Sequence, residues 1–116
     1  MQKTRHKNIK KGDVWLITNV KAVGHIQKGL RPHVVVTQVT GETVTVAPCT
    51  SAPEKVHQKY VVEIRPTEDN GLIMVSFVLL FQSFAADISL LQEKIGCLDE
   101  NEIARLQLEY VKYVTD

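Results

Sequence analysis

The sequence predicts an α+β domain built on a small, strongly curved sheet, and two observations lead to this prediction. Short runs of β-branched and apolar residues, separated by turn signals, fill the first two thirds of the chain. The last third changes to the spacing of an amphipathic helix. Short strands followed by a terminal helix are typical of α+β domains. With 116 residues, 44% hydrophobic and 23% charged, the chain has the composition of one globular domain with a modest core.

Five segments have the composition of strands. They cover residues 13–17, 33–39, 43–47, 60–65 and 72–81, and the last is apolar enough to hold one or two buried strands. A turn signal over residues 40–42 predicts that the second and third strands form a hairpin. Loops or turns are expected over residues 20–32, 48–58 and 66–71, where glycine, proline and polar residues gather.

The C-terminal third is expected to hold two helices. Residues 89–95 predict a short helix that ends near Gly96. Asp99, followed three residues later by Glu102, has the pattern of a capping box and predicts the start of a final helix. Apolar residues recur along that helix at helical spacing and predict a stripe on the core, namely Ile103, Leu106, Tyr110, Val111 and Val114.

The charges are unevenly divided along the chain. Residues 1–60 hold ten Lys and Arg against three acids, a net of +7, whereas residues 61–116 hold four against ten, a net of −6. Such an asymmetry suggests a surface that faces a polyanion. Residues 1–10 are polar and basic, so we expect a flexible tail in front of a single domain over residues 11–116.

Cysteine usage and hydropathy exclude several classes. Cys49 and Cys97 have neither metal-type spacing nor the pattern of a disulfide framework, so we expect no metal site. The basic N-terminus is not followed by the apolar core of a signal peptide. The longest apolar run, residues 72–81, is far shorter than the roughly 18 residues that a membrane helix needs. We therefore expect a cytoplasmic protein with no membrane partner.

A colinear set of short motifs carries a family resemblance. In order, the chain contains GDVWLI, GHIQKGLRP, VVV, VAPCTS, VEI, SFVLLFQ and KIGCL. From about Lys11 to Val114 this set resembles the MazF/PemK/Kid toxins. The resemblance implies a small SH3-like β-barrel of the CcdB/MazF type, with a short helix and a C-terminal helix. It also implies a homodimeric endoribonuclease that cleaves single-stranded mRNA without metal or cofactor, and that a cognate antitoxin protein neutralises.

The chemistry of RNA cleavage explains which residue types such a site needs. RNA carries its own nucleophile, the 2′-OH beside the scissile phosphate, so the enzyme supplies a base, an acid and positive charge for the phosphorane. Arg31 matches the catalytic arginine of the family, and a planar guanidinium bonds two phosphate oxygens at once. The alternative for Arg31 is an ordinary solvated loop arginine before a proline.

Two further residues match catalytic positions of the family. Thr50 matches the active-site threonine, whose hydroxyl can bond a phosphate oxygen; alternatively it caps a turn in a polar loop. His25 matches the histidine of the Kid-type subgroup and titrates near neutrality, with an ordinary pKa of about 6.5. In that subgroup a glutamate usually follows, whereas here Ile26 does, and an exposed loop histidine is the alternative.

Other residues are expected to bind RNA or to pack. Lys21 and Lys28 would contribute charge toward the RNA backbone, independently of sequence. The resemblance assigns further RNA contacts, at Gln27, Ser51 and Gln82. Cys49 is expected to fill space at a strand end rather than to act as a nucleophile, and Trp15 is expected in the core.

The chain also departs from the Kid-type pattern. Phe81 and Leu79 stand where that subgroup has its catalytic acid and arginine, and Phe84 replaces an arginine that contacts RNA. Either Arg31 and Thr50 suffice, as in the MazF-type subgroup, or a histidine (His25 or His57) compensates. A third alternative is a protein that binds RNA or antitoxin without cleavage. A CcdB-like gyrase poison is a fourth, but the chain ends Tyr-Val-Thr-Asp and lacks the Trp-Gly-Ile-type end of such proteins.

Overall fold

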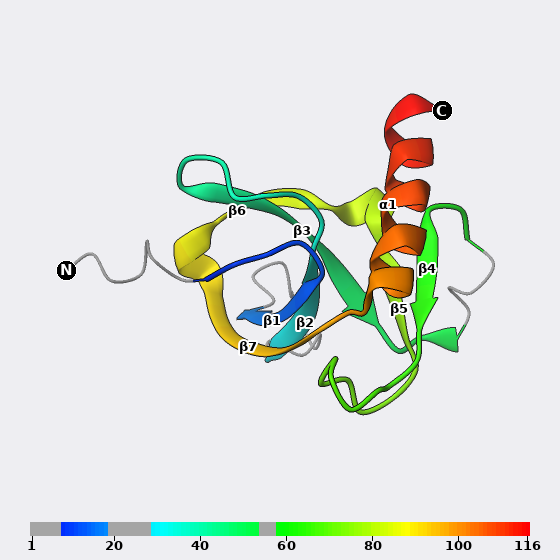
Figure 1. Ribbon diagram of the computed structural model, residues 1–116, viewed down its shortest axis with the longest axis horizontal. Helices are drawn as coiled ribbons and strands as arrows, with labels where there is room; N and C mark the ends of the chain where they lie inside the picture. Colours follow the sequence, from blue (N-terminus) through cyan, green and yellow to red (C-terminus); the bar gives the residue numbers. More distant parts are fainter. Residues whose placement is uncertain (1–7, 19–28, 54–57) are drawn as a thin grey trace.

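The computed structural model describes residues 8–18, 29–53 and 58–116, and within them it has seven strands, one α-helix and short 3₁₀ turns (Figure 1). The strands are β1 (Asp13–Thr18), β2 (Leu30–Val35), β3 (Thr43–Thr50), β4 (Val61–Ile64), β5 (Ser76–Leu79), β6 (Phe84–Asp87) and β7 (Leu91–Cys97). The 3₁₀ turns η3 (Leu80–Gln82) and η4 (Ile88–Leu90) flank β6, and α1 (Glu100–Thr115) closes the chain. The predicted α+β class is confirmed.

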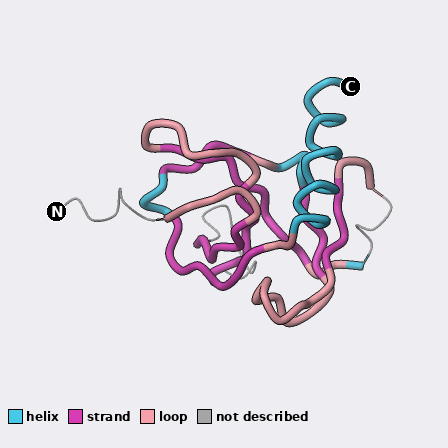
Figure 2. The backbone as a smooth tube through the Cα atoms, in the orientation of Figure 1, coloured by secondary structure: helices cyan, strands magenta, loops and turns pink. Residues whose placement is uncertain are grey.

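The strands, magenta in Figure 2, form one antiparallel sheet. Their order is β4-β5-β3-β2-β1-β7. On one edge β3 pairs with β2. On its other edge the first half of β3 pairs with β6, from Thr43 to Val46, and its end pairs with β5, at Cys49 and Thr50. Because β3 changes partner midway, the sheet curls into a barrel-like shape. In the described part of the chain no pairing joins the outer strands β4 and β7, so the sheet is not closed.

The curled sheet has two hydrophobic clusters. The first lies on the side of α1 and contains Val14, Val34, Val36, Ala47, Cys49, Val62, Ile64, Leu72, Val78, Leu80, Leu98 and Leu106. The second lies within the curled strands and contains Trp15, Ile17, Val35, Val44, Val46, Ala86, Ile88 and Leu91. Neighbouring residues of β2 point to different clusters, so both faces of this strand are covered.

The hairpin of the second and third strands is confirmed, but its bounds differ from those predicted. β2 begins at Leu30 and ends at Val35, earlier at both ends than the predicted 33–39, because Arg31 and Pro32 pair with Ile17 and Leu16 of β1. β3 continues to Thr50, into the predicted loop 48–58, because its last residues pair with β5.

Two predictions for residues 72–95 are wrong in part or in whole. Of the apolar run 72–81, only Ser76–Leu79 forms a strand, and the run ends in η3. The helix predicted over residues 89–95 is instead β7, preceded by the turn η4. β7 forms because its backbone pairs with the edge of β1 that β2 leaves unpaired. The ion pair between Lys94 of β7 and the buried Asp13 of β1 (3.3 Å) stabilises this pairing.

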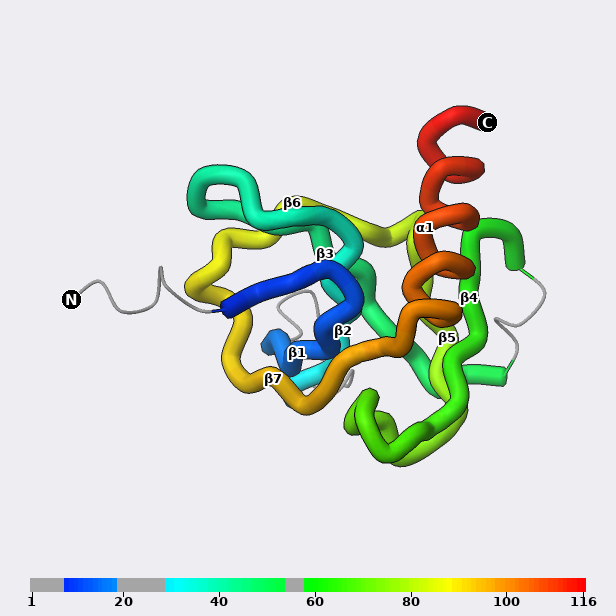
Figure 3. The backbone as a smooth tube through the Cα atoms, viewed as in Figure 1, coloured from blue at the N-terminus to red at the C-terminus, as the bar shows by residue number. Residues whose placement is uncertain are grey.

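The capping box of α1 is confirmed. The Asp99 side chain accepts a hydrogen bond from the backbone N–H of Glu102 (2.7 Å), and the Glu102 side chain accepts one from the N–H of Asp99 (2.9 Å). Figure 3 shows α1 beside β4, against which it packs. Leu106 is buried there, with Ile103 and Tyr110 packed around it. Val111 and Val114 are exposed, so the prediction that they lie on the core was wrong.

No helix among the described residues is both long enough and apolar enough to span a membrane.

Two glycines in the left-handed region allow a matched test of the loop between β4 and β5. Gly71 (φ 73°) has no room for a side chain, because a Cβ there would overlap the carbonyl of Ile95 on β7. Gly41 (φ 62°) has open space around it. Gly41→Ala should cost about 1 to 2 kcal/mol through the backbone conformation alone. Gly71→Ala adds a steric overlap and should cost about 3 kcal/mol or more. Urea unfolding measures both, and equal costs would contradict the close contact between the loop and β7.

Candidate active site

The register of β2 and β3 brings two predicted catalytic residues together. His33 of β2 lies opposite Pro48 of β3 in this antiparallel pair. Arg31 precedes His33 by two residues and Thr50 follows Pro48 by two residues, so the same register brings Arg31 and Thr50 together. Both line a pocket of about 620 Å³ at this end of the sheet. The other lining residues come from β1, β2, β3, β5, β7 and the loops after β3 and β4, namely Leu16, Leu30, Pro32, Cys49, Ser51, Gly71, Leu72, Ile73, Met74, Ser76 and Ile95. The predicted site residues Arg31, Thr50 and Ser51 therefore share one pocket.

Arg31 provides the positive charge of this pocket. Among the described residues that line it, Arg31 is the only charged one. Its backbone pairs with Ile17 of β1, so its side chain lies at the end of the sheet that carries the pocket. An anion that enters the pocket therefore meets one half-buried guanidinium amid mostly apolar walls, where electrostatic attraction is stronger than in open water.

Thr50 is held in one orientation by its own turn. Its Oγ1 accepts a hydrogen bond from the backbone N–H of Ala52 (3.2 Å). The turn-capping interaction considered for Thr50 is thus present, and it is compatible with a role in the site. A hydroxyl that accepts through a lone pair keeps its own O–H for donation, so Thr50 can still donate to an anion in the pocket.

Cys49 lies beside these residues but is not suited to nucleophilic attack. Its side chain is buried in the cluster next to α1. Burial raises the pKa of its thiol to about 12, and the nearby positive charge of Arg31 offsets only part of that increase. Since the thiolate is the reactive form, Cys49 packs the strand end, as expected from the sequence.

His33 is a further residue near the site that sequence reasoning did not single out. It is buried on β2, two residues from Arg31 and on the same side of the strand. Its Nδ1 donates a hydrogen bond to the carbonyl oxygen of Arg31 (2.9 Å), and its ring meets the edge of Phe84 at 5.9 Å between centroids. Burial is the main cause that lowers the pKa of His33; its hydrogen bond to Arg31 opposes this, while the charge of Arg31 adds to it. His33 therefore fixes the backbone from which Arg31 projects.

Gln82 does not line this pocket. It is exposed in η3, whose neighbouring residue Phe81 accepts a hydrogen bond through its carbonyl from the Tyr113 hydroxyl of α1 (3.3 Å). η3 thus lies against the helix. Several other candidates fall outside the described residues, namely Lys21, His25, Gln27, Lys28 and His57.

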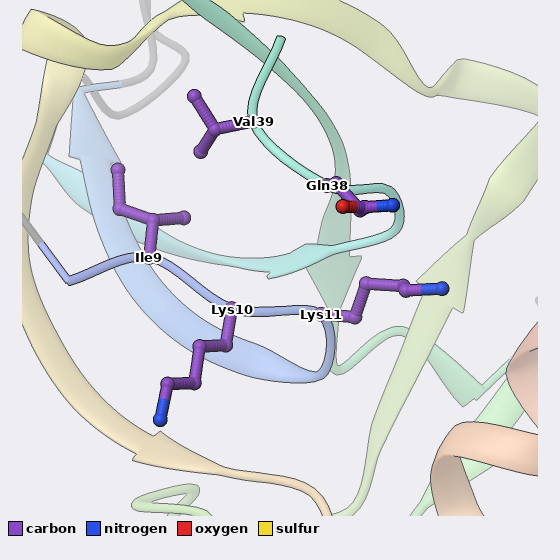
Figure 4. A pocket seen from close by; sticks show the side chains of 5 residues that line it. All are labelled: Ile9, Lys10, Lys11, Gln38 and Val39. Atoms are coloured by element: carbon purple, nitrogen blue, oxygen red, sulfur yellow. The ribbon is translucent and has the colours of Figure 1, made fainter.

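A second pocket, of about 400 Å³, lies away from these residues. Ile9, Lys10, Lys11, Gln38 and Val39 line it (Figure 4). Figure 4 shows that the side chains of Lys10 and Lys11 extend in different directions, so their amines do not converge on one point. Over residues 8–18, 29–53 and 58–116, no three His, Cys, Asp or Glu side chains gather closely enough to hold a metal ion.

Comparison with protein-family models gives one match, over residues 10–110, to the PemK-like, MazF-like toxin of type II toxin-antitoxin systems. The chain belongs to this family. The match spans most of the chain, including β1 to β7 and most of α1. The predicted family is therefore confirmed. A comparison with curated proteins found no match.

Solved structures of MazF toxins share the fold of this PemK-like chain. MazF from Deinococcus radiodurans is 19% identical, with 93% of this chain and 97% of that chain covered and a TM-score of 0.69. Toxin MazF-mt6 from Mycobacterium tuberculosis is also 19% identical, with 90% and 98% covered and a TM-score of 0.70. An endoribonuclease in complex with its cognate antitoxin, from a mycobacterial species, is 13% identical, with 91% and 94% covered and a TM-score of 0.69. At these identities the likeness establishes the MazF-like fold.

The buried His33 predicts a pH dependence of stability. Its pKa in the folded protein is lowered, whereas in the unfolded chain it is about 6.5. The unfolded chain therefore takes up a proton that the folded protein resists, so His33 reduces stability as the pH falls below about 6.5. His33→Asn keeps an N–H donor for the Arg31 carbonyl but does not titrate. Urea unfolding between about pH 7 and pH 5 should show a shallower loss of stability in the variant than in the wild type. Equal slopes would contradict the burial of a neutral His33.

Proposed function

We propose that this PemK-like protein is a toxin that cleaves single-stranded RNA by attack of the 2′-OH on the adjacent phosphate, without a metal or cofactor. The observation that supports this most is the pairing of β2 with β3, which puts Arg31 and Thr50 into one pocket. A cationic fork beside a hydroxyl donor suits a phosphate that gains negative charge in the transition state.

In the proposed mechanism each residue has a separate role. Arg31 bonds two oxygens of the phosphate and stabilises the phosphorane, since the planar guanidinium matches the geometry of two phosphate oxygens. Thr50 donates its hydroxyl to one of the same phosphate oxygens, and Ser51 lines the same pocket. His25 is the proposed acid or base, on the family resemblance alone. Lys21, Lys28 and Gln27 are proposed RNA contacts on the same ground, and Gln82 would act only on RNA that extends beyond the pocket.

The proposal includes the partners that the family suggests. A cognate antitoxin is proposed because one similar structure is an endoribonuclease in complex with its antitoxin. A homodimer is proposed because apolar side chains are exposed along the second half of α1, namely Leu108, Val111, Tyr113 and Val114. The proposed location is the cytoplasm, where mRNA is found.

One specific observation favours a second candidate, a family member that binds RNA or antitoxin without cutting. Phe81 and Phe84 occupy positions where the Kid-type subgroup has polar catalytic and RNA-binding groups. Here the Phe81 backbone contacts α1 through Tyr113, and the Phe84 ring packs against His33. Phe81 and Phe84 therefore support the fold. Any cleavage depends on Arg31, Thr50 and the proposed acid or base, His25.

The test is cleavage of a defined single-stranded RNA in excess EDTA. The proposal predicts that cleavage persists, because Arg31 supplies the positive charge, and that the products carry 2′,3′-cyclic phosphate ends, because the 2′-OH is the nucleophile. Mass spectrometry identifies these ends. A requirement for added divalent ion, or products with 3′-hydroxyl ends, would contradict this mechanism. Binding without any cleavage would favour the second candidate.

A further inference from the structure

We propose that the loop between β4 and β5 forms the wall of a nucleobase-binding site next to the phosphate, with Ile73 and Met74 as the side chains that contact the base. The inference rests on the proposed function, since it takes RNA as the ligand of the Arg31 pocket. It adds a chemical class of subsite and two residues that neither the motifs nor the family match singled out.

The first observation is the exposure of apolar side chains that line the pocket. Ile73 is 92% exposed and Met74 52% exposed, and across the pocket Leu30 is 48% exposed. All three line the same pocket as Arg31, Thr50 and Ser51. Exposed apolar side chains that gather at a pocket are typical of binding sites. Those of α1, by contrast, line neither of the two pockets described above.

The second observation is that the loop is held firmly, so the exposure does not arise from a loose segment. Asn70 is fully buried below the loop. Its Oδ1 accepts hydrogen bonds from the backbone N–H groups of Thr67 (3.2 Å) and Leu72 (3.0 Å), and its Nδ2 donates to the carbonyl of Arg65 (2.9 Å). Each end of the Asn70 amide is thus bonded to the loop backbone.

The same loop is also attached to β7, beneath which it runs in Figure 1. The backbone N–H of Cys97 donates to the carbonyl of Asp69 (2.8 Å). Gly71 lies so close to the Ile95 carbonyl that no side chain fits between them. Leu72, the next residue, is buried in the core. Ile73 and Met74 therefore project from a preorganised support, which lowers the entropic cost of ordering them around a ligand.

The third observation is that the guanidinium and its neighbouring hydroxyls come from different elements of the pocket than the apolar side chains of the loop. Arg31, Thr50 and Ser51 lie on the ends of β2 and β3, whereas Leu72, Ile73 and Met74 come from the loop after β4. A nucleotide has the same division, a phosphate joined to a flat base with apolar faces. A volume of about 620 Å³ lies within the range of small-ligand pockets. Aliphatic side chains contact the face of a base through apolar surface and form no hydrogen bonds with its edge. We therefore expect them to bind purines more tightly than pyrimidines, because purines bury more apolar area.

The experiment measures binding rather than cleavage, so that it does not depend on catalysis. The probe is a fluorescent single-stranded oligonucleotide with all four bases and with 2′-deoxyribose throughout, which removes the nucleophile. A set of probes replaces each base in turn with an abasic site. The proteins are wild type, Ile73→Ser, the double variant Ile73→Ser/Met74→Ser, and Leu90→Ser. Leu90 is an exposed leucine on η4 that does not line the pocket, and it serves as the matched control.

The inference predicts that one abasic position weakens wild-type binding by about 5-fold or more, the loss typical of one stacked base. The double variant should bind the intact probe with a similar loss and should show no further loss at that abasic position. Ile73→Ser should give part of this effect, and Leu90→Ser should behave as wild type. Because Ile73 is almost fully exposed, its replacement should leave the unfolding midpoint unchanged.

Four other results are informative. Base-dependent binding that persists in full in the double variant overturns the inference. The inference is also overturned if the double variant loses binding of an antitoxin peptide but responds to the abasic probes as the wild type does. The loop would then bind a protein partner and not a base. If the wild type binds no oligonucleotide, the result contradicts both the proposed RNA function and the base site. A wild type that binds through Ile73 and Met74 yet cleaves no RNA would support the base site and contradict only the proposed catalysis.

Discussion

The structure depends on one strand, β3, which pairs with three others. Along one edge it is bonded to β2, and along the other it is bonded first to β6 and then to β5. This change of partner curls the sheet and divides the interior into two clusters, with Val44 and Val46 in one and Ala47 and Cys49 in the other. The end of β3 carries Thr50 into the pocket. A change in the register of β3 would therefore alter both clusters and the candidate site together.

The candidate site follows from this pairing and from the burial around it. Arg31 and Thr50 come from adjacent strands, and His33 fixes the backbone of Arg31 from within the sheet. Phe84 packs against His33 and lies on β6, which pairs with β3. What remains for chemistry in the described part of the pocket is the guanidinium of Arg31 and the hydroxyls of Thr50, Ser51 and Ser76, beside an apolar loop.

The sequence predicted the elements whose signals are local. The capping box at Asp99 and Glu102, the hairpin of β2 and β3, and the first strand all depend on neighbouring residues, and each was confirmed. Predictions failed where tertiary contacts decide. Residues 91–97 carry a pattern short enough for a helix or a strand, and the open edge of β1 selects the strand. Val111 and Val114 continue the helical stripe beyond the end of the sheet and stay exposed. The family motif indicated Arg31 and Thr50, but the importance of His33 and Asn70 lies in their burial, which a single sequence does not display.

The central claim is that Arg31 and Thr50 act on the same phosphate, and a double-mutant cycle on single-turnover RNA cleavage tests it most directly. Arg31→Lys keeps the charge but loses the fork, and Thr50→Val removes the hydroxyl at constant shape. Loss of one such donor typically costs about 100- to 1,000-fold in rate. If both residues bond one transition state, the double variant should lose far less than the product of the two single losses. Arg105→Lys on α1, remote from the pocket, is the control and should cleave as the wild type does. Losses that simply multiply, or an Arg31→Lys variant that cleaves at nearly the wild-type rate, would contradict the claim.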